Sequence, residues 1–324
     1  MNHLRRSILL GLASVPTLAC YAQAQKYPNR PVRLIVPYGA GGSGDAAARS
    51  VGEGLGKLWG QTLIIDNRPG ANEIVAADLT AKSPPDGYTY LLASEATPSV
   101  NPFLYSKLPY DPKDLVPVGR MLTSQYALVV SPDFPAKTLK EFVEEVKRHP
   151  GKYNFGSQGI GGPNHLAMSW FENMTGMKME HVPYRSLPQG IQEVAAGRVE
   201  AMFGPIGSIS PFIRKGQLKA IAVSGKVRQP EIPDVPTFAE SGFPDFEASF
   251  YLGVFAPVGT PSDMIHQFSR DMNKVISDSA FQRKYFQPQA YDAIGDTPEQ
   301  FAEFLKKDRI RAQERVKVSG AKLD

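Results

Sequence analysis

Val32-Arg-Leu-Ile-Val36 runs directly into Pro37-Tyr-Gly-Ala-Gly-Gly-Ser-Gly-Asp45, and this stretch decides the fold. The apolar run predicts a β-strand, the glycines predict a turn, and the residues after them predict the first turn of a helix. Glycine lets the backbone come close to a ligand, and the unpaired amides of a first helical turn carry the positive end of the helix dipole. The stretch therefore predicts a site for a carboxylate or phosphate group.

The rest of the chain alternates short β-branched runs with helical patterns, which is typical of an open α/β sheet. A clear amphipathic helix is predicted at Leu139–Arg148, and His149-Pro150-Gly151 ends it. The segment from Pro261 to Val318 predicts two or three helices, separated near Pro288 and Pro298. The predicted strands are 32–36, 63–65, 88–92, 126–130, 180–182, 201–203, 220–223 and 251–255.

A second strand, glycine turn and helix follow in the middle of the chain. Tyr153–Ser157 leads into Gln158-Gly-Ile-Gly-Gly-Pro163, and the helical pattern begins at Asn164. This order repeats that of the first glycine turn. The two turns can therefore face each other across a cleft and bind one anionic group together.

The first residues predict an export signal. Arg5 and Arg6 precede the apolar segment Ile8–Leu18, and Ala22-Gln23-Ala24 is a cleavage site, so residues 1–24 are predicted to be removed. The only cysteine, Cys20, lies in this signal, in a loose resemblance to a bacterial lipoprotein box. We favour cleavage over lipid anchoring at Cys20, which leaves a periplasmic protein without a thiol and hence without a disulfide.

Length and charge limit the classes of function. About 300 residues after the signal suggest two domains. The chain has 36 Lys and Arg against 32 Asp and Glu, without basic runs, so we expect no nucleic-acid partner. No later segment approaches the roughly 20 apolar residues of a transmembrane helix.

Two enzyme interpretations compete with simple binding. Gly39, Gly41 and Gly44 satisfy the spacing of a dinucleotide-binding loop, and Asp66 ends the next strand where a ribose-binding acid would lie. Pro37 and Tyr38 intrude between that strand and the glycines, and an exported protein meets little nicotinamide cofactor. We therefore predict no cofactor.

Hydrolysis is disfavoured by the surroundings of the serines. Neither Ser157 nor Ser43 lies in the G-x-S-x-G pattern that exposes a nucleophile. The histidines show no metal-ligand spacing, so no metal site is predicted. His165 is interpreted as a packing residue at the start of its helix, and Asp45 as an acid that organises the loop amides.

The ordered motifs of the chain resemble those of Bug-type, TctC-like extracytoplasmic receptors of the tripartite tricarboxylate transporters. The resemblance covers nearly the whole chain after the signal. The motifs that carry it are Tyr27–Val32, Val36–Asp45, Asp66–Ala71, Pro85–Tyr88, Asn101–Tyr105, Leu108–Asp111, Phe155–Gly161, Val182–Arg185, Asp234–Thr237 and Ala256–Pro261.

This resemblance implies an α/β periplasmic-binding-protein (Venus flytrap) fold with two domains, each a sheet flanked by helices. It implies a ligand carboxylate held between the domains by the two glycine loops, and no catalysis. The first loop corresponds to Tyr38, Ala40, Gly41, Gly42, Ser43 and Asp45, and the second to Ser157, Gly159, Ile160 and Gly161. The far end of the ligand is expected to meet Ser94, Thr97, Tyr184 and Pro205.

The chain departs from the family pattern at the expected far end. Relatives often place a polar or acidic side chain near Gly204 and glycines near Asn72-Glu73, so the far contacts cannot be carried over. Glu95 is unexpected beside a dicarboxylate. We expect Glu95 to point to solvent, with pairing to a donor on a nitrogenous ligand as the alternative.

These expectations combine into a domain assignment and a function. Residues 25–122 and 250–324 are predicted to form one domain and 123–249 the other, with a hinge near Met121–Thr123 and Ser249–Tyr251. The predicted function is capture of a small organic carboxylate by a monomeric receptor and its delivery to membrane permease subunits. Dicarboxylates, amino acids and aromatic carboxylates remain open as ligands. An exported enzyme and a sensory receptor are the alternatives.

Overall fold

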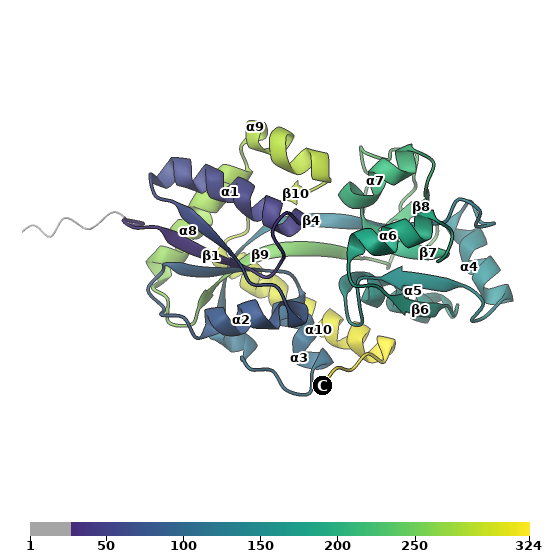
Figure 1. Ribbon diagram of the computed structural model, residues 1–324, viewed down its shortest axis with the longest axis horizontal. Coiled ribbons are helices and arrows are strands. Elements are labelled where there is room, and N and C mark those ends of the chain that lie inside the picture. The colour runs from purple at the N-terminus through teal and green to yellow at the C-terminus, as the bar shows by residue number, and fades with distance from the viewer. Residues whose placement is uncertain (1–26) are drawn as a thin grey trace, which may run out of the picture.

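The computed structural model describes residues 27–324. The chain forms two lobes joined by two long strands, β4 (Leu115–Val130) and β9 (Ser249–Pro257), which run between them in Figure 1. The predicted signal, its cleavage site and Cys20 lie outside the described residues. Within the described part of the chain, no helix is both long enough and apolar enough to cross a membrane.

The sheet of the first lobe has the strand order β2-β1-β3-β9-β4, and β10 (Asp292–Ala293) pairs with β4. Its first three strands are parallel, and β9 runs antiparallel to both β3 and β4. These parallel strands are β1 (Val32–Val36), β2 (Leu63–Asn67) and β3 (Thr89–Ala93).

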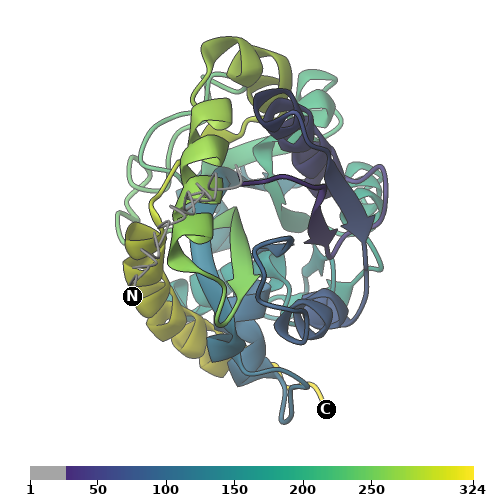
Figure 2. The ribbon, with the colours of Figure 1, turned by 90° about the vertical axis from the view of Figure 1, so that its left-hand side faces the viewer.

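Helices surround this sheet, as the end view of the first lobe shows (Figure 2). The helices of the lobe are α1 (Ser43–Trp59), α2 (Ile74–Ala81), α3 (Asn101–Leu104), α8 (Ser262–Ile276), α9 (Ser279–Phe281) and α10 (Pro298–Ser319). Short turns complete it: η1 (Ala71–Glu73), η2 (Ala96–Val100), η3 (Pro112–Asp114), η4 (Gln282–Phe286) and η5 (Gln287–Gln289).

The second lobe is built on the end of β4, where residues 126–130 pair with both β7 and β8. Beyond β7, the strands β5 and β6 continue the sheet in parallel. Its strands are β5 (Asn154–Ser157), β6 (Glu180–Pro183), β7 (Ala201–Pro205) and β8 (Lys219–Val223). Its helices are α4 (Leu139–Arg148), α5 (Pro163–Thr175), α6 (Leu187–Ala195) and α7 (Ile206–Arg214).

Each lobe has its own apolar core. In the first lobe Tyr90, Phe268 and Met272 pack with the strands under α1 and α8. In the second lobe Phe142, Phe171 and Phe203 fill the space between the sheet and the helices α4 and α5. A smaller cluster joins the lobes, because Leu166 of α5 packs with residues of η2, α3, α10 and the segment after α10: Val100, Leu104, Ala312, Val316 and Ala321.

The predicted strands and the predicted helix Leu139–Arg148 are confirmed, and Thr138 caps that helix with a capping box. The main difference lies in β4, which begins at Leu115, well before the predicted start at Tyr126. Pro117 and Gly119 obscure this half of the strand, because both residues are unfavourable in strand interiors. The pairing of β4 with β9 shifts register at these residues, which is how the strand accommodates them.

Candidate ligand-binding site

The first glycine loop leads into α1, whose first turn has backbone amides without hydrogen-bond partners among the described residues. Gly42 is the N-cap and offers no side chain to the helix. Leu139, by contrast, begins a helix whose N-cap Thr138 accepts a backbone hydrogen bond through its hydroxyl. Within the described residues, the amides of Ser43, Gly44 and Asp45 have no hydrogen-bond partner. The first turn of α1 is therefore open to an anion.

Asp45 organises this loop through hydrogen bonds to its carboxylate, as predicted. Its carboxylate accepts hydrogen bonds from the Gly41 amide at 2.9 Å, from Asn67 at 2.8 Å and from Arg49 at 2.9 Å. Burial raises the pKa of Asp45, but the hydrogen bonds from Arg49, Gly41 and Asn67 outweigh it and lower the pKa to about 2. Asp45 is thus a charged support for the loop, and Gly41 is held with a φ of 83°.

The second glycine loop opens onto the first turn of α5 in the same way. The N-cap Gly162 has no side chain, and Pro163 occupies the first turn. The amides of Ile160, Asn164 and His165 have no partner among the described residues. The predicted donors Gly159 and Gly161 are instead used within the loop, since Gly159 donates to the Ser157 hydroxyl and Gly161 donates to Nδ1 of His165.

Two histidines support the second loop. The rings of His165 and His181 stack with their centroids 4.0 Å apart, and burial lowers the pKa of both to about 4. His165 is thus the packing residue that was predicted, and it also orients the Gly161 amide. Ser157 lies 2.6 Å from Nε2 of His181, but its side chain is buried and also bonds to Gly159. It is therefore closed to a substrate.

Three of the predicted ligand contacts meet on a residue that the sequence interpretation missed. The hydroxyls of Tyr38, Ser94 and Thr97 donate to the carboxylate of Glu73 at 2.7, 2.7 and 2.8 Å. The Ser94 amide adds a fourth donor at 3.1 Å. Burial raises the pKa of Glu73, and the hydrogen bonds from Ser94, Tyr38 and Thr97 lower it in part. These donors therefore bind a carboxylate of the chain itself.

The backbone around Glu73 is strained to reach this position. Ala71, Asn72 and Glu73 have φ angles of 45°, 49° and 73°, a region that favours glycine. Such residues cost on the order of 1–3 kcal/mol each, whereas hydrogen bonds to a charged group contribute about 1.5–3 kcal/mol each. The four donors offset the strain. The departure from the family's glycines at Asn72-Glu73 was the one signal in the sequence.

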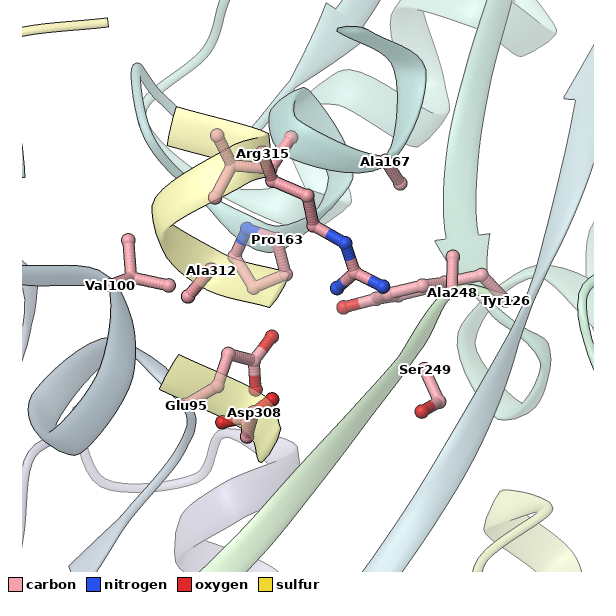
Figure 3. Close-up of a pocket in the computed structure, with 11 residues that line it drawn as sticks. Glu95, Val100, Tyr126, Pro163, Ala167, Ala248, Ser249, Asp308, Ala312 and Arg315 are labelled. Carbon is pink, nitrogen blue, oxygen red and sulfur yellow. The ribbon is translucent and has the colours of Figure 1, made fainter. Parts of the chain in front are cut away.

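A small cavity of about 20 Å³ lies beside this cluster, between the lobes. Figure 3 shows the carboxylates of Glu95 and Asp308 close together in it, while the guanidinium of Arg315 points towards Tyr126. Asp308 accepts hydrogen bonds from Ser99 at 2.6 Å and Tyr251 at 3.1 Å. Among the described residues, no ion pair within 4.0 Å joins Arg315 to either carboxylate.

The expectation that Glu95 points to solvent is wrong. Its Oε2 atom is buried without a hydrogen-bond partner in the described chain. Burial, and then the negative charge of Asp308, raise the pKa of Glu95 to about 8. The side chain turns inward because the turn η2 directs it towards α10, which no local sequence pattern reveals.

The remaining predicted residues lie around these elements. Ala40, Gly41, Gly42 and Ser43 are exposed on the first loop, and Ile160 is 45% exposed on the second. Tyr184 follows β6, and its amide donates to the Ser157 carbonyl at 2.8 Å. Pro205 ends β7 opposite Tyr126 of β4, so it lies where the sheet of the second lobe meets the linking strand.

The dinucleotide interpretation fails at its acidic residue. Asp66 pairs with Arg33 and Arg68, so its carboxylate is already neutralised by the chain. The described residues also contain no group of three or more His, Cys, Asp and Glu side chains that could hold a metal ion.

Two lobes, each presenting an uncapped glycine turn at a helix N-terminus, define the class of solute-binding proteins with the periplasmic-binding-protein fold. The family model described as the tripartite tricarboxylate transporter family receptor matches residues 47–320, and the chain belongs to this family. Its members are periplasmic solute-binding receptors, so the chain is a binding protein and not an enzyme.

Relatives and solved structures agree with this assignment. The chain is 36% identical to a UPF0065 protein of Bordetella pertussis, over 85% of this chain and 86% of that one. It is 32% identical to Protein BugT of the same organism, with both chains fully covered. Two similar solved structures come from Rhodopseudomonas palustris. Rpa4515 with adipate is 27% identical, with a TM-score of 0.83 over 92% of this chain and 100% of that one. MatC with bound malate is also 27% identical, with a TM-score of 0.78 over 90% of this chain and 100% of that one.

Proposed function

We propose that this chain is an exported receptor that captures a small organic carboxylate between its lobes and delivers it to membrane permease subunits of the tripartite tricarboxylate type. The observation that carries the proposal is the pair of free first turns, at α1 in one lobe and α5 in the other. Backbone amides with a helix dipole behind them bind a carboxylate by charge-assisted hydrogen bonds, and water can complete the shell.

The proposed contacts follow from these free donors. Ala40, Ser43 and the first turn of α1 hold the carboxylate from one side, and Ile160 with the first turn of α5 holds it from the other. Gly41, Gly159 and Gly161 shape the loops. Tyr184 and Pro205 face the ligand from the second lobe. The similar structures with adipate and malate support a carboxylate as the ligand class.

The arrangement of the linking strands supports the proposed domains and hinge. We place the domain boundary at residues 122–123 and 249–250. This lies a few residues before β4 exchanges its partner β9, paired up to Gln125, for β7 from Tyr126 and β8 from Ala127. Bending of these two strands would open and close the cleft, as in other two-lobed receptors. The closed form would present one continuous surface to the permease.

The proposal is tested by thermal unfolding of the purified protein with a panel of small carboxylates. A ligand at one hundred times its dissociation constant stabilises the folded state by about 2.7 kcal/mol. We expect a clear rise in Tm with one chemical class of carboxylate, and the same compound recovered unchanged. Absence of any shift across the panel contradicts the proposal, and uncharged analogues of each compound are the control.

A further inference from the structure

The hydrogen-bond donors near the cleft fall into two sets: some have no partner, and others are already bound to a carboxylate of the chain. The amides of Ser43, Gly44 and Asn164 have no partner among the described residues. The hydroxyls of Tyr38, Ser94 and Thr97 are all occupied by Glu73, whose side chain is 6% exposed. A carboxylate of the ligand can therefore bind to the first set, but a second one meets donors that are already satisfied.

We propose that Glu73 takes the place of a second ligand carboxylate, so that this receptor selects compounds with one carboxylate and a cationic or N–H-donating group at the other end. The inference rests on the proposed function. It names Glu73 as a specificity-determining residue and aminocarboxylates as the substrate class.

The surroundings of Glu73 favour a donor at this end of the ligand. Glu95 follows Ser94 in the chain, and its Oε2 is a buried acceptor without a partner in the described chain. Asp308 lies beside it in the cavity, and neither carboxylate has a cation within 4.0 Å among the described residues. Arg315 lines the same cavity and is the cation that acts on both carboxylates, so the cluster does not lack positive charge. The unsatisfied group is the buried Oε2 of Glu95, which an N–H donor of the ligand would satisfy and a second ligand carboxylate would not.

The size and position of the cavity agree with this assignment. Its volume of about 20 Å³ suits one water-sized group, such as an ammonium group. Pro163, in the first turn of α5, lines the same cavity as Glu95. The first turn of α5, which carries the free Asn164 amide, therefore begins at the cavity that holds the unpaired oxygen of Glu95.

Compounds of matched length show whether the protein prefers a ligand with one carboxylate or with two. Isothermal titration with the purified protein compares hexanoate, adipate and 6-aminohexanoate, then butyrate, succinate and 4-aminobutyrate, then benzoate, terephthalate and 4-aminomethylbenzoate. Within the series whose length fits, we expect the aminocarboxylate to bind at least tenfold more tightly than the dicarboxylate. Equal or tighter binding of the dicarboxylate overturns the inference while leaving the proposed function intact.

Substitution of Glu73 tests its role directly. Glu73→Gly frees the hydroxyls of Tyr38, Ser94 and Thr97 and suits the left-handed backbone, so we expect the dicarboxylate to gain at least tenfold in affinity. Glu73→Gln is the matched control: its amide oxygen still accepts from the hydroxyls, so the dicarboxylate should gain much less. Equal gains in both variants overturn the assignment, and circular dichroism verifies that each variant is folded.

Failure of the proposed function looks different. If neither the natural protein nor Glu73→Gly binds any of the nine compounds, carboxylate capture itself is wrong, and the inference falls with it. If Glu73→Gly binds dicarboxylates and the natural protein does not, the result supports the proposal that Glu73 takes the place of a second ligand carboxylate.

Discussion

At the scale of single residues, the glutamates Glu73 and Glu95 differ in the hydrogen bonds that their carboxylates receive. Glu73 receives hydrogen bonds from three hydroxyls and one amide, so its charge is solvated by the protein. Glu95 has a buried oxygen without a partner in the described chain, and a neighbouring acid. A residue that destabilises the empty protein is typical of a binding site, since its partner arrives with the ligand.

This difference predicts a pH-dependent gain in stability for Glu95→Gln. The pKa of Glu95 is about 8 in the folded state against an ordinary value of 4.5, so the folded state holds its proton more tightly than the unfolded state. Stability is therefore unaffected below pH 4.5 and is lost as the pH rises towards 8. One pKa unit corresponds to about 1.4 kcal/mol. The variant should be more stable than the natural protein at pH 8 and nearly equal to it at pH 4.5.

Urea unfolding of both proteins at the two pH values measures the effect. Glu314→Gln, which removes an exposed carboxylate from α10, is the matched control and should show no such pH dependence. An equal change for Glu95→Gln at both pH values contradicts the assignment of the raised pKa to this residue.

At the scale of elements, α1 and α5 both begin at a glycine that leaves their first turns uncapped. The helices α4, α6 and α10 begin at Thr138, Ser186 and Thr297, whose side chains accept hydrogen bonds from their first turns. An uncapped helix forgoes about 1 kcal/mol of stability. The helices α7 and α8 also lack a side-chain cap, but they begin at Pro205 and Pro261 and not at a glycine turn. We expect the free amides at the glycine turns of α1 and α5 to be the ones that a ligand caps.

Gly42→Asp should therefore abolish carboxylate binding without unfolding the protein. Gly42 has extended angles, φ −74° and ψ 166°, and an added Cβ would meet only the Gly39 carbonyl, at 3.4 Å. An aspartate here accepts from the amides of the first turn and repels an incoming carboxylate. We expect affinity to fall at least a hundredfold, with stability within about 1 kcal/mol of the natural protein.

Calorimetric titration and thermal unfolding of the same preparations give both quantities. Gly42→Ala adds only a methyl group, which makes the same 3.4 Å contact with the Gly39 carbonyl, and should retain its affinity within about threefold, because it neither caps the helix nor adds charge. If Gly42→Asp binds as tightly as Gly42→Ala, the first turn of α1 is not the carboxylate site.

The elements also show what the sequence can and cannot predict. The strand before the first glycine turn was predictable, because its run of β-branched and apolar residues stops at Pro37 and the glycines. The strand before the second turn was predictable from its place between the Pro150-Gly151 turn and the glycines that follow Ser157. The first half of β4 was not, because Pro117 and Gly119 fit a strand only where the register shifts. The roles of Glu73 and Glu95 could not be predicted for another reason. The hydroxyls of Tyr38 and Thr97 that bind Glu73, and the Asp308 carboxylate beside Glu95, come together only in the folded protein.

At the scale of the whole molecule, β4 and β9 tie the lobes together, and the cluster around Leu166 is a second contact between them. Leu166 of α5 is 4% exposed and packs with Val100, Leu104 and Val316 from the other lobe. In addition, an added Cβ at Gly161 of the second loop would lie 2.3 Å from the side chain of Leu104, so these surfaces are in direct contact. We expect these apolar contacts to favour a closed form of the protein before any ligand binds.

Leu166→Ala should accordingly shift the protein towards an open form. Replacing a buried leucine by alanine within a core lowers the free energy of unfolding by about 2–5 kcal/mol. Because Leu166 lies between the lobes, we expect its loss to destabilise the closed form relative to the open form instead. Apparent affinity is reduced by the fraction of protein in the competent form. We expect a larger radius of gyration by small-angle X-ray scattering, at least tenfold weaker carboxylate binding, and recovery of the natural radius when ligand is saturating.

Met168→Ala supplies the matched control, because Met168 lies on the same helix but is fully buried in the core of the second lobe. It should lower the free energy of unfolding by about 2–5 kcal/mol and leave the radius unchanged. If Leu166→Ala behaves like Met168→Ala, with lower stability and the same radius, then α5 and α10 form one rigid unit and the motion at β4 and β9 does not separate these surfaces. An increase in radius confined to Leu166→Ala instead shows that this cluster closes with the cleft, which links ligand capture to the surface that a permease would meet.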